Sequence, residues 1–181
     1  MTAPAAPAST AWKLDPTHSA VEFSARHMMF TTVKGRLSDV GGTIAVDGDS
    51  PESAVVNVTM KAASLDTRTE QRDAHLRSAD FLDTDTFPDI TFASTAITGG
   101  RDRFAMTGNL TIRGTTKPVT LDVTYEGTGK DPWGGERMGF VADGKFDRRE
   151  FGLTWNQALE AGGVLVSNDI KIHIDAQLVR G

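Results

Sequence analysis

The sequence has no cysteine among its 181 residues, and aromatic residues make up only 7% of it, with a single tyrosine. Without cysteine there is no disulfide, no thiolate metal ligand and no cysteine nucleophile. The chain also lacks an apolar run near the roughly 20 residues that a membrane-spanning helix requires, so we expect no stable membrane insertion. Covalent cross-links therefore play no part in holding the fold together.

Positive charge is also scarce. The net charge is -5, from 19 Lys and Arg against 24 Asp and Glu. The basic residues are dispersed, and no stripe of them is available to follow a phosphate backbone, which argues against nucleic acid as a partner. The first eleven residues, MTAPAAPASTA, lack the basic and apolar segments of a secretion signal. We therefore expect a flexible tail over 1–11, a single domain over 12–181 and a cytoplasmic protein.

What the sequence does contain is a two-residue alternation of apolar and polar side chains, which is typical of half-buried β-strands. It predicts strands over residues 20–27, 56–62, 90–92, 104–112, 119–125, 138–146 and 170–178. An eighth strand covers 33–46, where the apolar positions change parity between Ser38 and Val40, as one extra residue in a bulge would cause. Short links between these segments indicate antiparallel neighbours.

Eight such strands in up-and-down order leave two open edges unless the sheet closes on itself. We therefore predict an all-β fold, an extended eight-stranded antiparallel barrel. A sandwich of two sheets carries the same alternation, and periodicity alone does not separate the two architectures. No internal repeat or second domain is visible.

One charged stretch interrupts the strands: TRTEQRDAHLRSADFLDTDTFPDITF, from Thr67 to Phe92. Thr67 and Glu70 have the spacing of a capping box, in which each side chain pairs with a backbone N–H at a helix start. This spacing predicts a helix over about 68–79. Pro88 then marks the return to extended chain.

The predicted helix is mostly polar. Asp73 and Arg77 are spaced for a surface ion pair worth about 0.3–0.5 kcal/mol. Its apolar face consists chiefly of Leu76 and Ala79, which is too little for a core element. We therefore expect the helix to lie across one end of the barrel as a lid.

Four segments, taken in order, resemble the successive motifs of the YceI-like family: LDPTHSAVEFSARH, SLDTRTEQRDAHLRSADFLDTDTFPDITF, GNLTIRGTTKPVTLDV and DPWGGERMGF. The resemblance extends from about Trp12 to Val179. It implies a lipocalin-like barrel whose interior holds a long apolar ligand, typically a polyisoprenoid such as a quinone or a prenyl diphosphate. Some family members act in the periplasm, which is the alternative to a cytoplasmic location.

The side chains on the inward faces decide whether the barrel is full or hollow. Small residues alternate there with larger ones, namely Ala25, Gly35, Ala62, Gly108, Ala142 and Gly144 with Phe23, Met60, Phe92, Met106 and Phe140. A solid core would need more volume at the small positions, so the pattern favours a tunnel. Small residues that only fit the taper of a filled barrel are the alternative.

Eleven side chains are candidates for contact with a ligand. They are Phe23, Phe92, Met106 and Phe140 on inward faces; His27, Met28, Met29 and Phe30, the HMMF segment, at a mouth; and Phe151, Trp155 and Leu159 on the opposite wall. Methionine adapts well to an irregular apolar guest, and His27 is placed to meet a polar head group. Ordinary core packing explains several of these residues equally well.

Together, the residues and the resemblance predict a binding protein that stores or transports a long-chain lipid, without catalytic residues, metal or cofactor. The resemblance also favours a homodimer. The alternative is a metal-assisted hydrolase or other small-molecule enzyme that uses His27 and His75. No H-x-x-x-H, G-x-S-x-G or dinucleotide motif supports that alternative.

Overall fold

The computed structural model describes residues 9–47 and 51–181. The strands in these ranges are β1 (Thr10–Leu14), β2 (Ala20–His27), β3 (Thr31–Leu37), β4 (Val40–Val46), β5 (Val55–Lys61), β6 (Leu65–Asp66), β7 (Asp89–Gly99), β8 (Arg103–Ile112), β9 (Thr115–Lys130), β10 (Glu136–Asp147) and β11 (Asp169–Arg180). The α-helix is α1 (Glu70–Arg77), and short 3-10 helices are η1 (Pro51–Ser53), η2 (Ala62–Ser64) and η3 (Arg148–Phe151). None of the helices in the described ranges has the length and apolar surface that crossing a bilayer requires.

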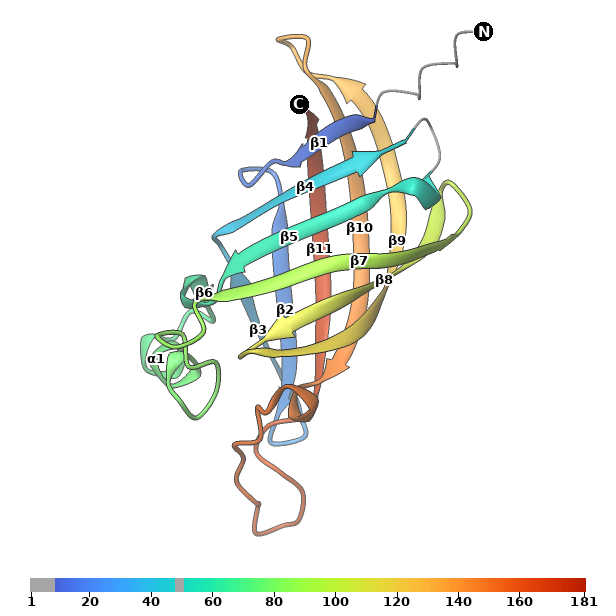
Figure 1. Cartoon of the computed structure of the whole chain (residues 1–181). Helices are drawn as coiled ribbons and strands as arrows, with labels where there is room; N and C mark the ends of the chain where they lie inside the picture. Colours follow the sequence, from blue (N-terminus) through green and yellow to red (C-terminus); the bar gives the residue numbers. More distant parts are fainter. Residues whose placement is uncertain (1–8, 48–50) are drawn as a thin grey trace, which may run out of the picture.

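The strands form one antiparallel sheet that closes on itself (Figure 1). The order around the ring is β1-β4-β5-β7-β8-β9-β10-β11, and the pairing of β1 with β11 completes it. Closure satisfies the backbone groups that would otherwise stand free at two edges. The predicted eight-stranded antiparallel barrel is therefore confirmed, and the sandwich alternative is wrong.

The strands β2, β3 and β6 extend the sheet beside this ring. β1 pairs with the C-terminal part of β11 and β2 with its N-terminal part, so these two strands are one long strand interrupted by a bend. β3 and β4 pair with β2 and β1 in the same way. Their break falls at Ser38 and Asp39, where the change of parity predicts it.

The strand β1 is not among the predicted strands. It begins at Thr10, inside the range 1–11 that we expect to be a tail, and residues 1–8 of that range lie outside the described residues. Trp12 and Leu14, two residues apart in β1, both face the barrel interior. A strand of five residues is too short to show a clear two-residue alternation in the sequence.

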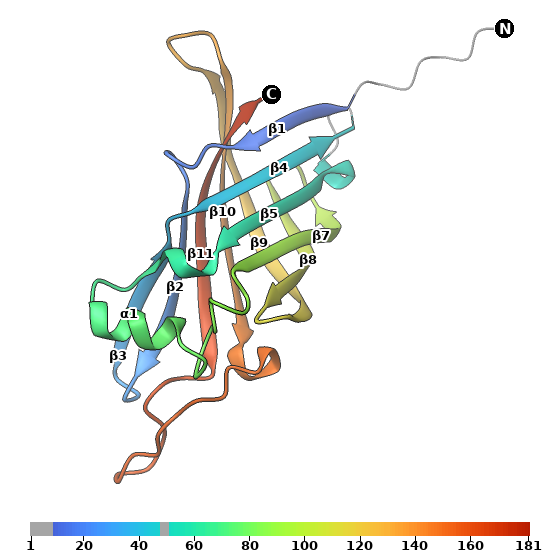
Figure 2. The same ribbon diagram turned by 60° about the vertical axis from the view of Figure 1, so that its left-hand side comes forward.

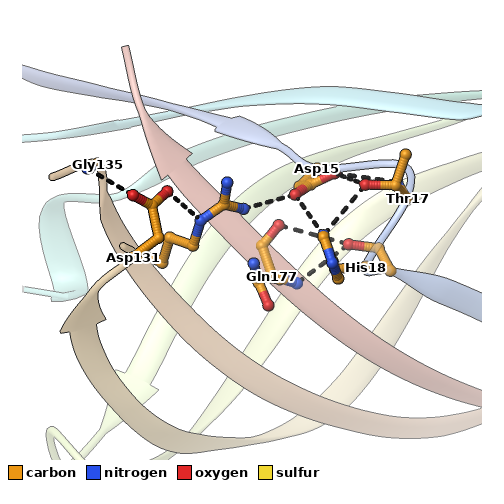
Figure 3. A network of polar contacts seen from close by, with 8 residues as sticks. Asp15, Thr17, His18, Asp131, Gly135 and Gln177 are labelled. Carbon is orange, nitrogen blue, oxygen red and sulfur yellow. Dashed lines mark hydrogen bonds and ion pairs between the residues drawn. The ribbon is translucent and has the colours of Figure 1, made fainter. Parts of the chain in front are cut away.

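The bend between β1 and β2 is built by residues 15–19, DPTHS (Figure 3). Asp15 accepts hydrogen bonds from the backbone N–H and the hydroxyl of Thr17 (3.0 and 2.6 Å) and lies 2.8 Å from Nδ1 of His18. The hydroxyl of Ser19 accepts the N–H of Gln177 and donates to its carbonyl oxygen. The chain therefore bulges opposite β11 while the backbone of Gln177 stays paired.

Arg137 ties this bend to the turn between β9 and β10. Its Nη1 donates to the carboxylate of Asp15 (2.6 Å), and its Nε donates to that of Asp131 (2.8 Å). Hydrogen bonds from Thr17, His18 and Arg137 hold the pKa of Asp15 well below its usual range. Two of the motifs quoted above, LDPTHS and DPWGGER, thus meet in one structural network.

The start of α1 differs from the prediction. Its N-cap is Thr69, with no side-chain cap hydrogen bond, so the predicted capping box of Thr67 and Glu70 is wrong. Thr67 is buried, and its backbone N–H and hydroxyl both donate to Asp73 (2.9 and 2.5 Å). The predicted ion pair of Asp73 with Arg77 is also wrong, because Arg77 donates instead to backbone carbonyls of η2 and β6.

Polar contacts therefore compensate for the thin apolar face of the helix. Arg72 donates to the hydroxyl and the carbonyl oxygen of Thr67, which adds a second link between α1 and the chain that follows β6. Leu76 contributes to the barrel interior. Figure 2 shows α1 beside one end of the barrel, near the start of β7, and its role as a lid stays a prediction.

The hydrogen bonds that anchor α1 predict which of its acidic residues contributes to the free energy of unfolding. Asp73→Ala is expected to lower the free energy of unfolding by about 1–3 kcal/mol, because it leaves the buried N–H and hydroxyl of Thr67 without an acceptor. Glu70→Ala, at an exposed position of the same helix, is expected to change it by less than about 0.5 kcal/mol. Urea unfolding measures both changes in the free energy of unfolding. If Thr67 and Glu70 formed a capping box, Glu70→Ala would have the larger effect.

The depressed pKa of Asp15 predicts a pH dependence. A carboxylate whose pKa is lowered by folding stabilises the protein above its ordinary pKa of 3.8, and this contribution is lost as the pH falls through the lowered value. Asp15→Asn should therefore lower the free energy of unfolding at pH 7 by about 1–3 kcal/mol and less at pH 3 and below. Unfolding curves across this range check it, with Asp85→Asn at an exposed site as control. A difference that does not shrink on acidification would contradict the assignment.

Candidate functional site

A cavity of about 500 Å³ lies inside the barrel. Every strand of the ring contributes to its wall, for example through Trp12, Ile44, Val58, Phe92, Met106, Leu121, Phe140 and Ile174. The volume falls within the range of sites that bury small molecules. The wall is almost wholly apolar, so it offers a ligand burial rather than hydrogen bonds.

The cavity extends between the two ends of the barrel. At the end where the ring strands β1 and β10 begin and β11 finishes, its wall includes Thr10, Arg101, Tyr125 and Arg180. At the α1 end, its wall includes Leu76, Phe81, Arg148 and Leu153. An interior that spans the length of the barrel favours an elongated ligand over a compact one.

Glycines keep the aromatic rings of the wall away from the centre. The Cζ atom of Phe92 lies 2.2 Å from the position that a Cβ atom at Gly108 would take. At Gly35 the ring of Phe23 lies 2.4 Å from the equivalent position. Each ring therefore rests over the backbone of the neighbouring strand, where only glycine leaves room for it. The cavity confirms the hollow interior that the small inward residues predict, and these contacts show how part of it is kept open.

Four of the eleven candidate residues line this cavity, namely Phe23, Phe92, Met106 and Phe140. The ring of Phe140 lies 6.4 Å from that of Phe104 and 5.4 Å from that of Tyr125. These aromatic contacts fix the wall on the β8–β10 side of the barrel. Contact of the four residues with a ligand stays a prediction.

The HMMF segment comprises the last residue of β2 and the turn to β3, and it is not part of the cavity wall. Met29 and Phe30 are 57% and 73% exposed. Met28 and Met29 have φ angles of 49° and 68°, which non-glycine residues adopt only where the surroundings impose them. His27 ends β2 with a backbone bridge to Val166. The segment is an exposed apolar tip of the molecule, and its predicted contact with a ligand is not tested.

The three candidates for the opposite wall also lie outside the cavity lining. Phe151 is fully buried, with its ring 5.1 Å from that of Phe146, as ordinary core packing would have it. Trp155 packs edge-on against His75, with 4.7 Å between the ring centroids. Leu159 belongs to the loop before β11, where its N–H donates to a backbone carbonyl of the same loop. Their role toward a ligand stays a prediction.

Arg148 is a charged residue of the wall that the eleven candidates do not include. It begins η3 directly after β10 and is only 2% exposed. The parity of β10 carries the signal, because its inward positions are even, from Met138 to Phe146, and Arg148 continues that series. Because the side chain at this even position is charged, the apolar pattern of the sequence ends at Phe146. Alternation alone therefore does not predict that Arg148 faces the barrel interior.

The alternative of a metal-assisted hydrolase depends on His27 and His75. The ring of His75 lies 2.9 Å from the carboxylate of Asp80 and packs on Trp155, whereas His27 pairs with Val166 through the backbone. Across residues 9–47 and 51–181, no three His, Asp or Glu side chains are grouped so that they could hold a metal ion. The two histidines thus have different neighbours and no shared set of metal ligands.

A closed up-and-down barrel around a continuous apolar cavity defines the class of lipocalin-like β-barrels. Comparison with protein families narrows the class, because the model of the YceI-like domain matches residues 12–178. The chain therefore belongs to the YceI-like family, as the four motifs predict.

Known relatives agree with this assignment. Protein YceI of Salmonella newport (strain SL254) is 44% identical over 137 residues, which cover 76% of this chain and 72% of the relative. The crystal structure of the Campylobacter jejuni YCEI protein is 32% identical, with a TM-score of 0.75, over 86% of this chain and 90% of that one. A domain of Saccharophagus degradans described as polyisoprenoid binding is 12% identical, with a TM-score of 0.64, over 94% and 98% of the two chains. At that identity the last likeness concerns the fold.

The packing of Phe92 on Gly108 predicts the effect of one methyl group. Gly108→Ala is expected to lower the free energy of unfolding by about 1–3 kcal/mol, because the added Cβ displaces the Phe92 ring. Gly41→Ala is a matched control, since no atom lies within 4 Å of its Cβ position. Urea unfolding measures both variants, and a crystal structure of Gly108→Ala should show the ring moved into the lumen. Equal effects of the two substitutions would contradict the proposed packing.

Proposed function

We propose that the protein binds a long-chain apolar amphiphile of the polyisoprenoid class in its barrel and stores or transports it without chemical change. The observation that carries this proposal is a continuous apolar cavity along the barrel. The description of the S. degradans domain as polyisoprenoid binding supports the choice of ligand class.

Burial of hydrocarbon is sufficient to drive such binding. Each CH₂ group transferred from water to an apolar wall contributes about 0.8 kcal/mol. A branched chain of several isoprene units therefore gains affinity with each unit that enters, without any specific polar contact. Selectivity then depends mainly on the length and width of the cavity.

The composition of the wall supports a role without catalysis. Its polar members within the described ranges are Thr10, Glu22, Tyr125 and the arginines Arg101, Arg148 and Arg180. Glu22 is exposed, and the wall in these ranges contains no His, Ser, Asp or Lys. A nucleophile with an adjacent general base, which acyl or phosphoryl transfer would need, is therefore not formed by these residues.

The proposal predicts a dependence on chain length. Geraniol, farnesol and geranylgeraniol differ by one isoprene unit each, and each added unit should tighten binding at least about tenfold while it still fits the cavity. Native mass spectrometry and isothermal titration measure stoichiometry and affinity. Affinity that does not change along the series would contradict binding in the barrel, and chemical alteration of the recovered alcohol would contradict a non-catalytic role.

Two tryptophan substitutions locate the binding. Ala176 lines the cavity, whereas Ala45 is exposed on β4. Ala176→Trp should weaken geranylgeraniol binding at least about tenfold, because the indole occupies volume that the chain requires. Ala45→Trp carries the same side chain on the outer face and should leave the affinity unchanged. Equal loss in both variants, or in neither, would place the ligand outside the barrel.

A further inference from the structure

The side chain of Arg148 has an unusual set of partners. It donates to three backbone carbonyls, from Nη1 to Leu153 (2.6 Å) and Trp155 (2.9 Å) and from Nε to Ser167 (2.9 Å). Its second terminal nitrogen, Nη2, is buried and has no hydrogen-bond partner in the part of the chain that the structure describes. The contacts with the carbonyls hold the chain after η3 in place, but they do not account for Nη2. Buried polar groups without partners are rare, and functional sites are among their explanations.

The charge of Arg148 also has no ion-pair partner among the described residues, although the carboxylate of Asp147 attracts it from nearby. All its hydrogen-bond partners are neutral carbonyl groups, and an arginine side chain stays protonated in proteins. The adjacent carboxylate of Asp147 is engaged by Arg149, whose Nη2 lies 2.5 Å from it, and this contact lowers the pKa of Asp147 to about 2. Burial lowers the pKa of Arg148, the direction expected for a cation without a paired carboxylate.

The other polar groups of the cavity are placed differently. Arg180, at the opposite end, is half exposed and paired with Glu136. Arg101 is exposed to water, which weakens its attraction for an anion. Glu22, the acidic residue that contributes to the described wall, is exposed as well. Positive charge in a low-dielectric setting is therefore concentrated at the α1 end of the cavity.

We propose that the cavity holds its ligand with an oxyanion head group, a phosphate or a carboxylate, at Arg148, and with the apolar tail extending toward the end that Thr10 and Tyr125 line. Nη2 donates a hydrogen bond to the head, and the guanidinium charge is neutralised by it. This inference rests on the proposed function and refines it, because it names the chemistry of the head group and the orientation of the chain.

The test compares two probes that share one tail, geranylgeranyl phosphate and geranylgeraniol. Wild-type protein should bind the phosphate at least about tenfold more tightly than the alcohol, since the buried cation favours the charged head. Arg148→Met should remove this preference while the alcohol still binds, and Arg148→Lys should restore part of it. Arg101→Gln and Arg180→Gln test the opposite orientation, in which one of them would remove the preference. Arg103→Gln, at an exposed position of β8 outside the cavity lining, is the matched control and should keep it.

A second measurement uses only the wild-type protein, because Arg148 also holds backbone carbonyls and its replacement could impair folding. A geranylgeranyl phosphate with a diazirine beside the phosphate should label peptides that contain Phe146 or Leu153, as mapped by mass spectrometry. Labelling at Tyr125 or Arg101 instead would overturn the orientation.

Failure of this inference is distinguishable from failure of the proposed function. Equal affinity for the two probes, or loss of the preference in Arg101→Gln or Arg180→Gln, would overturn the role of Arg148 and leave lipid binding intact. Absence of binding by both probes would overturn the proposed function itself.

Discussion

Closure of the sheet depends on the short pairing of β1 with β11, which completes the ring of strands around the cavity. The contact joins Trp12, Lys13 and Leu14 to the last residues of β11. Because β1 covers only one end of β11, the chain must bend before β2 continues along the same partner. Asp15 accepts the hydrogen bonds that shape the bend, and Arg137 fastens it to the turn between β9 and β10. The polar network of Figure 3 thus supports an apolar interior from outside.

Two-residue alternation was sufficient to predict most of the ring, because each strand lines the interior with one face and meets water with the other. The alternation underestimates β7, because a bulge between Ser94 and Ala96 changes the parity of its inward positions from Phe92 to Ile97. It also underestimates β9, whose end at Lys130 lies beyond the apolar lining. It also misses β1, where few residues show the period. The barrel was therefore predictable from side chains that face the lumen, while its boundaries depend on backbone pairing between distant segments.

The site was predictable in part, for the same reason. Phe92 and Met106 line the cavity because inward parity places them there. The ring of Phe92 on β7 packs over Gly108 on β8, where no side chain is present. The alternation within a single strand does not predict a contact between two strands. Asp73 and Arg148 were misread or overlooked for a related reason. Charged residues are expected at the surface, whereas these two are buried. Asp73 accepts a hydrogen bond from Thr67, where the chain folds back on the helix, and Arg148 donates to the carbonyl of Ser167, which lies farther along the sequence.

The hollow interior also bears on how long the molecule survives. An empty lumen lacks the contacts that a filled core supplies, so the unloaded barrel relies on its wall alone. Any molecule that occupies the lumen of the folded chain and not the unfolded one adds to folding stability by mass action. Proteases attack transiently opened chains, and the frequency of opening follows that stability. Occupation of the lumen would thereby lengthen the lifetime of the folded chain.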